Sequence, residues 1–283
     1  MMSDRPPTAR ELLAFYLEAG VDCALADSPP DRLAEAAADD RAPPLAPGPA
    51  PGRAPAAAPT VRTTAPPAAP ARADAAPAPE VAIGSARAAA QAAATLDELA
   101  ARLAAFEGCA LKFTATRLVF ADGNPAARIM FVGEAPGRDE DIEGRPFVGR
   151  SGKLLDLMMA AIGLDRGSVY IANVIPWRPP GNRTPTPQET QICLPFIQRQ
   201  IELVNPDILV TLGNPSTQTL LNTRDGIMKT RGRWIEYHTG TRKIRAMPTF
   251  HPAYLLRSPA YKRLAWQDLR AIRKALAEVT EGR

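Results

Sequence analysis

Short apolar runs alternate with amphipathic segments over the last two thirds of the chain. Five runs, each read as a strand, occupy residues 128–132, 169–175, 207–212, 234–237 and 244–249. Apolar residues at helical spacing predict helices over residues 152–163, 187–204, 215–221 and 261–279. This order is typical of an α/β protein with a three-layer αβα architecture and a central, mostly parallel sheet. Ligands of such sheets bind beyond the carboxyl ends of the strands.

The first third of the chain has a different pattern. Residues 1–27 contain apolar positions at helical spacing and predict a short amphipathic helix, which would dock on the core or bind a protein partner. Residues 28–94 form an Ala/Pro-rich stretch, with 27 Ala or Pro among residues 41–80. Such a stretch buries too little apolar surface to offset the entropy cost of ordering it, so we expect a disordered linker. The remaining domain spans residues 95–283, and an Ala-rich helix over residues 86–105 is expected to lead into it.

Composition excludes several classes of protein. No run approaches the roughly 20 apolar residues of a membrane span, and the N-terminus shows no apolar secretory signal. Three separated cysteines, Cys23, Cys109 and Cys193, do not form a disulfide framework. We therefore expect a cytoplasmic protein that does not bind membranes.

The formal net charge of the chain is +4, but the charged residues are unevenly distributed along it. Residues 1–94 carry net −3 and residues 95–283 net +7, and within residues 224–274 there are 13 basic and 3 acidic side chains. A basic final third favours a polyanionic partner such as nucleic acid. On charge alone, an ordinary solvated basic face is an equally good interpretation.

Three loops at the expected strand ends carry candidate chemistry. The first strand runs into GEAPG (residues 133–137), which is neither a dinucleotide fingerprint nor a phosphate-binding P-loop. Phe147 lies in a Gly/Pro-rich loop, where it would either stack on a planar ring or simply anchor the loop. Asn173 ends the second strand, where its amide would either read a base edge or bond to backbone.

Two further segments suggest contacts with DNA. Arg178 and Arg183 lie in a long Pro-stiffened loop, placed to pair with phosphates or to sit in solvent. His251 follows the last predicted strand and so belongs to the same sheet edge. After it, apolar side chains next to cations suggest a wedge that enters a duplex, or else the first turn of a helix packing inward; these residues are Tyr254, Leu255, Arg257, Lys262 and Arg263.

Taken together, the motifs resemble the uracil-DNA glycosylase superfamily, and within it the type 4 branch, also described as phage-polymerase-related. The matching segments lie between residues 101 and 274 and read GEAPGRDEDIEGRPFVGRSGKLLD, NVIPWRPPGNRTPTPQE, ICLPFI and HPAYLLR. The resemblance implies a repair enzyme that hydrolyses the N-glycosidic bond of a flipped-out uracil in DNA and leaves an abasic site. Uracil-containing DNA is then the expected partner, and a monomer the expected state.

The same resemblance assigns roles to individual residues. Glu134 and Glu140 match the acidic positions of the first motif, and His251 matches the histidine of the last, so these three are the catalytic candidates. Phe147 matches the aromatic that stacks on uracil, and Asn173 the amide that reads the base. Ala135 lies on the base-binding side. Some sister families place a water-activating Asp there, and the residues do not settle which group activates water in this chain.

Cysteines are where the chain departs from this family. Type 4 members carry four cysteines for a [4Fe–4S] cluster, and here Cys109 and Cys193 match two of them while Phe106 and Trp177 occupy the other two positions. Two thiolates do not supply four ligands. We therefore expect no cofactor and no metal, with both aromatic side chains packed in that space. A [4Fe–4S] cluster is the alternative that the family implies.

Two other hypotheses keep the same fold but assign a different activity. One is a catalytically inactive DNA-binding module, against which the joint presence of Glu134, Phe147, Asn173 and His251 speaks. The other is an enzyme of altered specificity, acting on other deaminated bases. The sequence distinguishes neither single-stranded from duplex substrates nor U:G from U:A pairs.

Overall fold

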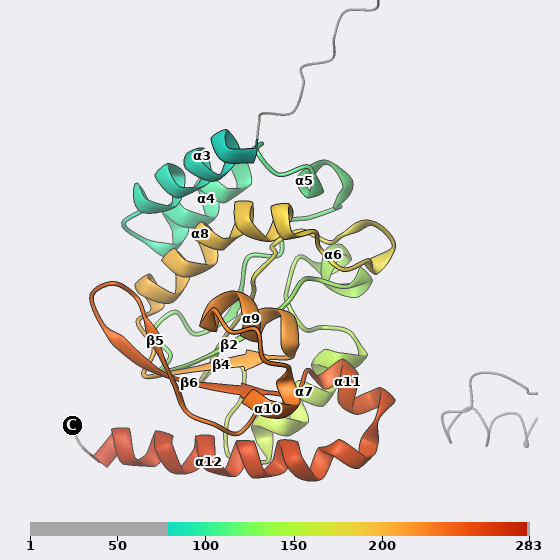
Figure 1. Ribbon diagram of the computed structural model, residues 1–283, viewed down its shortest axis with the longest axis vertical. Helices are drawn as coiled ribbons and strands as arrows, with labels where there is room; N and C mark the ends of the chain where they lie inside the picture. The colour runs from blue at the N-terminus through green and yellow to red at the C-terminus, as the bar shows by residue number, and fades with distance from the viewer. Residues whose placement is uncertain (1–78, 282–283) are drawn as a thin grey trace, which may run out of the picture. The chain divides into compact units, whose positions relative to one another are not determined.

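A computed structural model describes residues 79–281 of the chain (Figure 1). The predicted N-terminal helix and most of the predicted linker lie outside these residues. None of the helices in the described part is long and apolar enough to cross a membrane.

One six-stranded sheet forms the middle layer. Its strands, in the spatial order β1-β3-β2-β4-β6-β5, are β1 (Asp122–Gly123), β3 (Tyr170–Asn173), β2 (Ile129–Gly133), β4 (Ile208–Leu212), β6 (Lys243–Thr249) and β5 (Ile235–His238). The four central strands are parallel and the two edge strands are antiparallel to their neighbours. The expected mostly parallel sheet and its five strands are thus confirmed. The two-residue β1 is too short to leave a periodic signal in the sequence.

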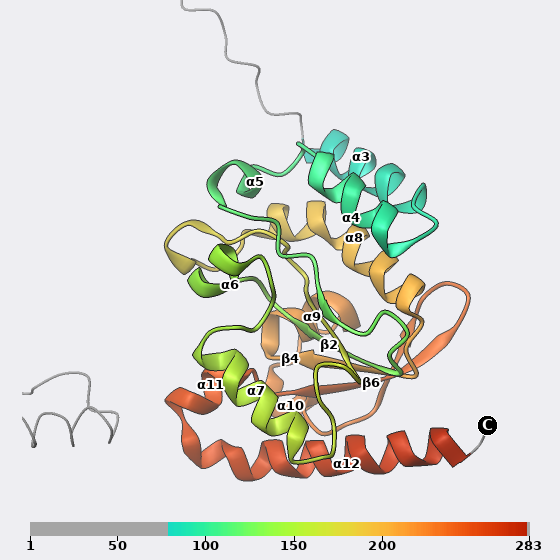
Figure 2. The ribbon, with the colours of Figure 1, turned by 180° about the vertical axis from the view of Figure 1, so that it is seen from behind.

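Helices cover both faces of the sheet, which gives the predicted three layers (Figures 1 and 2). The larger helices on one face are α3 (Pro79–Gln91), α4 (Leu96–Ala105), α8 (Pro187–Val204) and α9 (Asn214–Leu221), and those on the other are α7 (Arg150–Ala160) and α12 (Lys262–Glu281). Shorter elements fill the connections: α5 (Leu111–Thr114), α6 (Arg138–Glu143), η1 (Pro180–Asn182), α10 (Ile227–Thr230), α11 (Pro252–Arg257) and η2 (Pro259–Tyr261).

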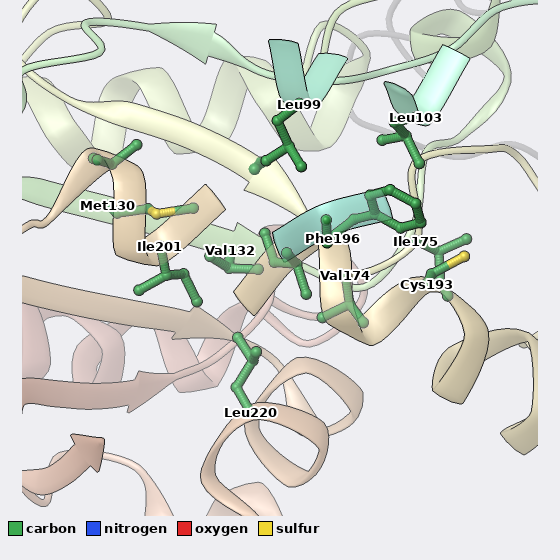
Figure 3. Packing of buried hydrophobic residues seen from close by; sticks show 14 of the residues in the cluster. Leu99, Leu103, Met130, Val132, Val174, Ile175, Cys193, Phe196, Ile201 and Leu220 are labelled. Carbon is green, nitrogen blue, oxygen red and sulfur yellow. The ribbon is translucent and has the colours of Figure 1, made fainter. Parts of the chain in front are cut away.

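Two apolar clusters hold the layers together. The first cluster includes Leu99 of α4, Phe196 of α8 and Val132 of β2 (Figure 3). The second joins Phe131, on the opposite side of the same strand, to helices α7 and α12. Successive residues of a strand point to opposite faces, so one continuous apolar run supplies both clusters. Burying each large side chain of this kind contributes roughly 1.5–3 kcal/mol.

The start of the ordered domain differs from the prediction. Helix α3 lies within residues 28–94, which we expected to be linker, and it packs against α8 through the buried Ala82, Ala86 and Ala90. The helix expected over residues 86–105 is two helices, because Thr95 caps the start of α4 by accepting the N–H of Glu98. Small alanine side chains let two helices approach closely. The resulting packing stabilises the pair, and a count of bulky apolar residues does not detect it. The domain therefore begins at or before residue 79.

Candidate functional site

A pocket of about 690 Å³ opens where the parallel strands end at their carboxyl edge. Register aligns Gly133 with Asn173 and Leu212 with Thr249, so the loops after these strands meet at one place. The sequence-predicted residues that line the pocket are Glu134, Ala135, Glu140, Phe147, Asn173, Arg183, His251, Tyr254 and Arg257. Residues from four separate motifs are thus brought together.

Phe147 and Asn173 both line the pocket, and their side chains lie close against Gly133. A Cβ atom added at Gly133 would lie 2.4 Å from Asn173 Oδ1 and 2.6 Å from Phe147 Cζ, so only glycine leaves both side chains in place. Asn173 is 5% exposed, and its Oδ1 atom has no hydrogen-bond partner among the described residues. A buried acceptor without a partner is costly in the free protein, and a ligand that donates a hydrogen bond to it would remove that cost.

The His251 ring packs against the Phe147 ring, with centroids 5.5 Å apart and a 31° tilt, and both residues line the pocket. It is the residue that caps α11, and its Nδ1 atom accepts the backbone N–H of Ala253 at 3.1 Å. Burial, together with the nearby Arg257 charge, lowers the pKa of His251 to about 4. The ring is therefore neutral at pH 7, and because Nδ1 is an acceptor, Nε2 carries the proton. The side chain is a neutral hydrogen-bond donor.

The two acidic candidates have different environments. Glu134 follows β2 at the pocket wall, and burial raises the pKa of its carboxyl above the ordinary value. Both oxygens of Glu140 are already engaged: Oε2 accepts the N–H of Gly137 at 3.0 Å, and Oε1 accepts those of Val148 at 3.1 Å and Gly149 at 3.0 Å. Of the two, Glu134 has the carboxylate available to a water molecule or substrate.

Some of the cations predicted to bind DNA are already paired within the protein, and others are exposed and able to bind a phosphate. Arg178 donates to Asn182 Oδ1 at 2.8 Å, and Arg183 pairs with Glu189 at 2.6 Å. Lys262 and Arg263, at the start of α12, are exposed.

One predicted DNA contact is wrong. Leu255 is 1% exposed and belongs to the core cluster between the sheet and α12, whereas Leu256 is 38% exposed. His251 and Pro252 begin α11, and the helical register that follows turns Leu255 inward. Tyr254 is partly buried against the rings of Phe250 and Tyr261, at centroid distances of 5.4 Å. Of the two adjacent leucines, Leu256 is the one exposed to solvent.

Two asparagines of the pocket wall were not among the predicted site residues. Asn182 lies in the loop that also carries Arg178, and Asn214 follows β4. The Oδ1 atom of Asn214 is buried and, like that of Asn173, has no partner among the described residues. Its position directly beyond a predicted strand was a usable signal, since the same rule located Asn173 and His251.

The region of the four family cysteine positions does not fit an iron–sulfur cluster. Cys109 and Cys193 are buried with their Sγ atoms 3.8 Å apart, and their contact and burial raise the pKa of Cys193 well above its usual value. Phe106 and Trp177 are buried, as predicted, and the Phe106 ring packs edge-on against Phe196 at 5.2 Å. The described residues contain no group of three or more His, Cys, Asp or Glu side chains that could hold a metal ion. A [4Fe–4S] cluster is held by four thiolates, and at two of the four family positions this chain has buried aromatic rings instead.

Comparison with known proteins gives one consistent result. The chain matches the Uracil DNA glycosylase superfamily over residues 120–270. It is 40% identical over 182 residues to the type-4 uracil-DNA glycosylase of Archaeoglobus fulgidus, which covers 63% of this chain and 92% of that protein. Identity to the type-4 uracil-DNA glycosylase of Thermotoga maritima is 44% over 164 residues, or 57% of this chain and 84% of that one. A DNA polymerase of Bacillus phage SP01 is 33% identical over 162 residues, which is 57% of this chain and 17% of the polymerase.

Proposed function

The chain belongs to the uracil DNA glycosylase superfamily, and we propose on that basis and from the pocket geometry that it hydrolyses the N-glycosidic bond of uracil in DNA. The observation that carries the proposal is the unpartnered Asn173 Oδ1 atom, buried next to an aromatic ring and a neutral histidine donor. An acceptor, a stacking surface and a donor within one pocket match the chemistry of a flipped-out pyrimidine.

Recognition of the base falls to Phe147 and Asn173. The Phe147 ring stacks on the flipped uracil, while Asn173 accepts the uracil N3–H and donates to O4. Cytosine presents an acceptor at N3 and a donor at N4, so it would face the amide with the opposite pattern. A site built to form these hydrogen bonds discriminates strongly, because a wrong base leaves buried polar groups without partners.

Bond cleavage generates an oxocarbenium-like sugar and a uracil anion. His251 donates its Nε2 proton in a hydrogen bond to uracil O2, where negative charge develops, and a neutral donor stabilises this charge without transferring its proton. Glu134 holds the attacking water and stabilises the cationic sugar. Glu140 orients the loops through its three backbone N–H contacts and has no direct part in activating water.

Incubation with a single-uracil oligonucleotide followed by alkali tests the proposal. We expect cleavage at the uracil position in single-stranded or duplex DNA, and no cleavage of the matched oligonucleotide with thymine or cytosine at that position. Salt-sensitive binding without release of uracil would instead support the inactive DNA-binding alternative. Release of another deaminated base in place of uracil would support altered specificity.

An iron-free enzyme is the second expected result, because two thiols and two packed aromatic rings occupy the cluster region. Protein purified without added metal should contain no stoichiometric iron. Its visible spectrum should lack the charge-transfer absorption of an iron–sulfur cluster. The double variant Cys109→Ala/Cys193→Ala should keep its activity, with a modest loss of stability from the small buried volume. Stoichiometric iron, or loss of activity in this variant, would contradict the expectation.

The remaining expectations stay predictions. These are the monomeric state, the cytoplasmic location and a protein partner for residues 1–27.

A further inference from the structure

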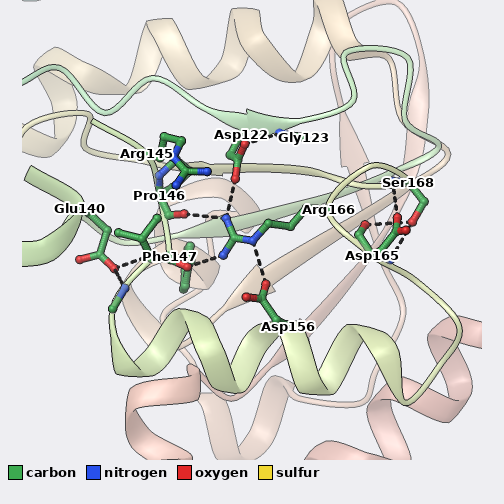
Figure 4. A network of polar contacts seen from close by, with 12 residues as sticks. Asp122, Gly123, Glu140, Arg145, Pro146, Phe147, Asp156, Asp165, Arg166 and Ser168 are labelled. Carbon is green, nitrogen blue, oxygen red and sulfur yellow. Dashed lines mark hydrogen bonds and ion pairs between the residues drawn. The ribbon is translucent and has the colours of Figure 1, made fainter. Parts of the chain in front are cut away.

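Arg166 donates hydrogen bonds to four groups from separate parts of the chain (Figure 4). It lies in the loop between α7 and β3, and its side chain is 26% exposed. The guanidinium donates to Asp122 Oδ2 at 2.5 Å and to Asp156 Oδ1 at 2.8 Å. It also donates to the backbone carbonyl of Pro146 at 3.2 Å and to that of Phe147. The two carboxylates hold the planar guanidinium in one orientation. Its remaining N–H groups then hold the two backbone carbonyls in place.

The backbone that Arg166 binds is unfavourable on its own. Phe147 has φ of 56°, in the left-handed region that bulky side chains rarely adopt. Such a conformation costs of the order of 1–3 kcal/mol and persists only where surrounding contacts impose it.

Three contacts impose it here. Arg166 binds the Phe147 carbonyl, and Gly152 lies so close beneath that an added Cβ would come within 1.6 Å of this carbonyl oxygen. Glu140 accepts the N–H groups of Val148 and Gly149 immediately after it. A cation on the carbonyls and a carboxylate on the N–H groups thus hold the turn from both sides, and in this turn the Phe147 ring lines the pocket.

We propose that Arg166 is a positioning residue that holds the Phe147 ring in the orientation that stacks on the flipped base. This rests on the stacking role given to Phe147 in the proposed function. Arg166 does not line the pocket, so its effect reaches the substrate through the turn alone. Misplacement of a substrate-positioning group by about 1 Å can reduce a rate by as much as a hundredfold.

A double-mutant cycle between Arg166→Gln and Phe147→Ala tests the proposal, read as the single-turnover rate constant of uracil release at saturating enzyme. Arg166→Gln is expected to lower this rate constant about tenfold in the wild-type background. In the Phe147→Ala background it should lower it less than about twofold, because the ring it positions is gone. Arg166→Lys should retain an intermediate rate, since lysine keeps the charge but not the planar fork.

Arg199→Gln is the matched control. Arg199 is also part-buried, with its side chain 27% exposed, and it also joins a backbone carbonyl, Ala93 O, to a carboxylate, Glu202. It lies on α8 away from the pocket, so the variant should lower the thermal midpoint but leave the rate constant unchanged. A role of Arg166 in stability alone would act in the same way, reducing the active fraction and not the rate constant.

The outcomes separate the positioning role of Arg166 from the stacking role of Phe147 and from the proposed activity. Equal factors for Arg166→Gln in both backgrounds, or an unchanged rate constant with only a lower thermal midpoint, would overturn the positioning role. If Phe147→Ala itself released uracil at the wild-type rate, the stacking role would be wrong. Absence of uracil release by the wild-type protein would overturn the proposed function before the cycle begins.

Discussion

Asn173→Ala should reduce the rate of uracil release by on the order of 10²–10³-fold and leave the fold intact. The Oδ1 atom that the variant removes has no partner among the described residues, so truncation breaks no hydrogen bond made by that atom in the free protein. The loss falls on the bound base, which no longer has an acceptor for N3–H or a donor for O4. Single-turnover release from a uracil oligonucleotide measures the rate, and the thermal midpoint reports on folding.

The matched control for this variant is Asn124→Ala. Asn124 is a partly buried asparagine in the connection between β1 and β2, and its Oδ1 atom accepts the N–H of Ala126 at 2.9 Å. Because it precedes β2, it lies at the amino end of the sheet, opposite the pocket. This variant should lose some stability and no activity. An Asn173→Ala enzyme with the wild-type rate would show that another group reads the base.

His251→Asn should reduce the rate by on the order of 10²-fold, comparable to removing one preorganised donor from an oxyanion site. Asparagine is a favoured helix cap, so it replaces Nδ1 as the acceptor for the N–H of Ala253 while its shorter side chain withdraws the donor from the pocket. The substitution therefore separates capping from catalysis. An unaltered rate would exclude His251 from the reaction, and a collapsed thermal midpoint would show that the ring is needed mainly for folding.

The same variant tests the lowered pKa of His251. Between pH 6.5 and about 4 the unfolded chain binds a proton at this histidine and the folded chain does not. The free energy of unfolding of the wild type should therefore fall as the pH drops through this window. His251→Asn lacks this contribution, so denaturant unfolding at pH 7 and pH 5 should show a smaller decrease for the variant than for the wild type.

Much of the architecture was predictable because the strands are short apolar runs between helices. The run at β2 is buried along its whole length, as a central parallel strand must be. Helix α3 was not predictable in the same way, because its buried face is alanine and its benefit comes from close contact with α8. Leu255 was misplaced for a related reason: the start of α11 sets which of two adjacent leucines turns inward.

In the site, the rule that ligands bind beyond strand ends located Asn173 and His251 from the sequence alone. The same rule does not specify which atoms are already engaged. Glu140 looks like a second catalytic acid in the sequence, and only the backbone N–H groups around it show that its oxygens are occupied. Arg166 left no signal at all, because two of its four partners are carbonyls that every residue carries.

The packing of α3 on α8 decides where the protein can be cut. A shortened protein that begins at residue 95 would lose Ala82, Ala86 and Ala90 and present the strip of α8 beneath them to water. Exposed apolar strips of this kind promote aggregation. A protein that begins at residue 79 keeps the strip covered, and is the shorter form to use for crystallisation and for titration with DNA.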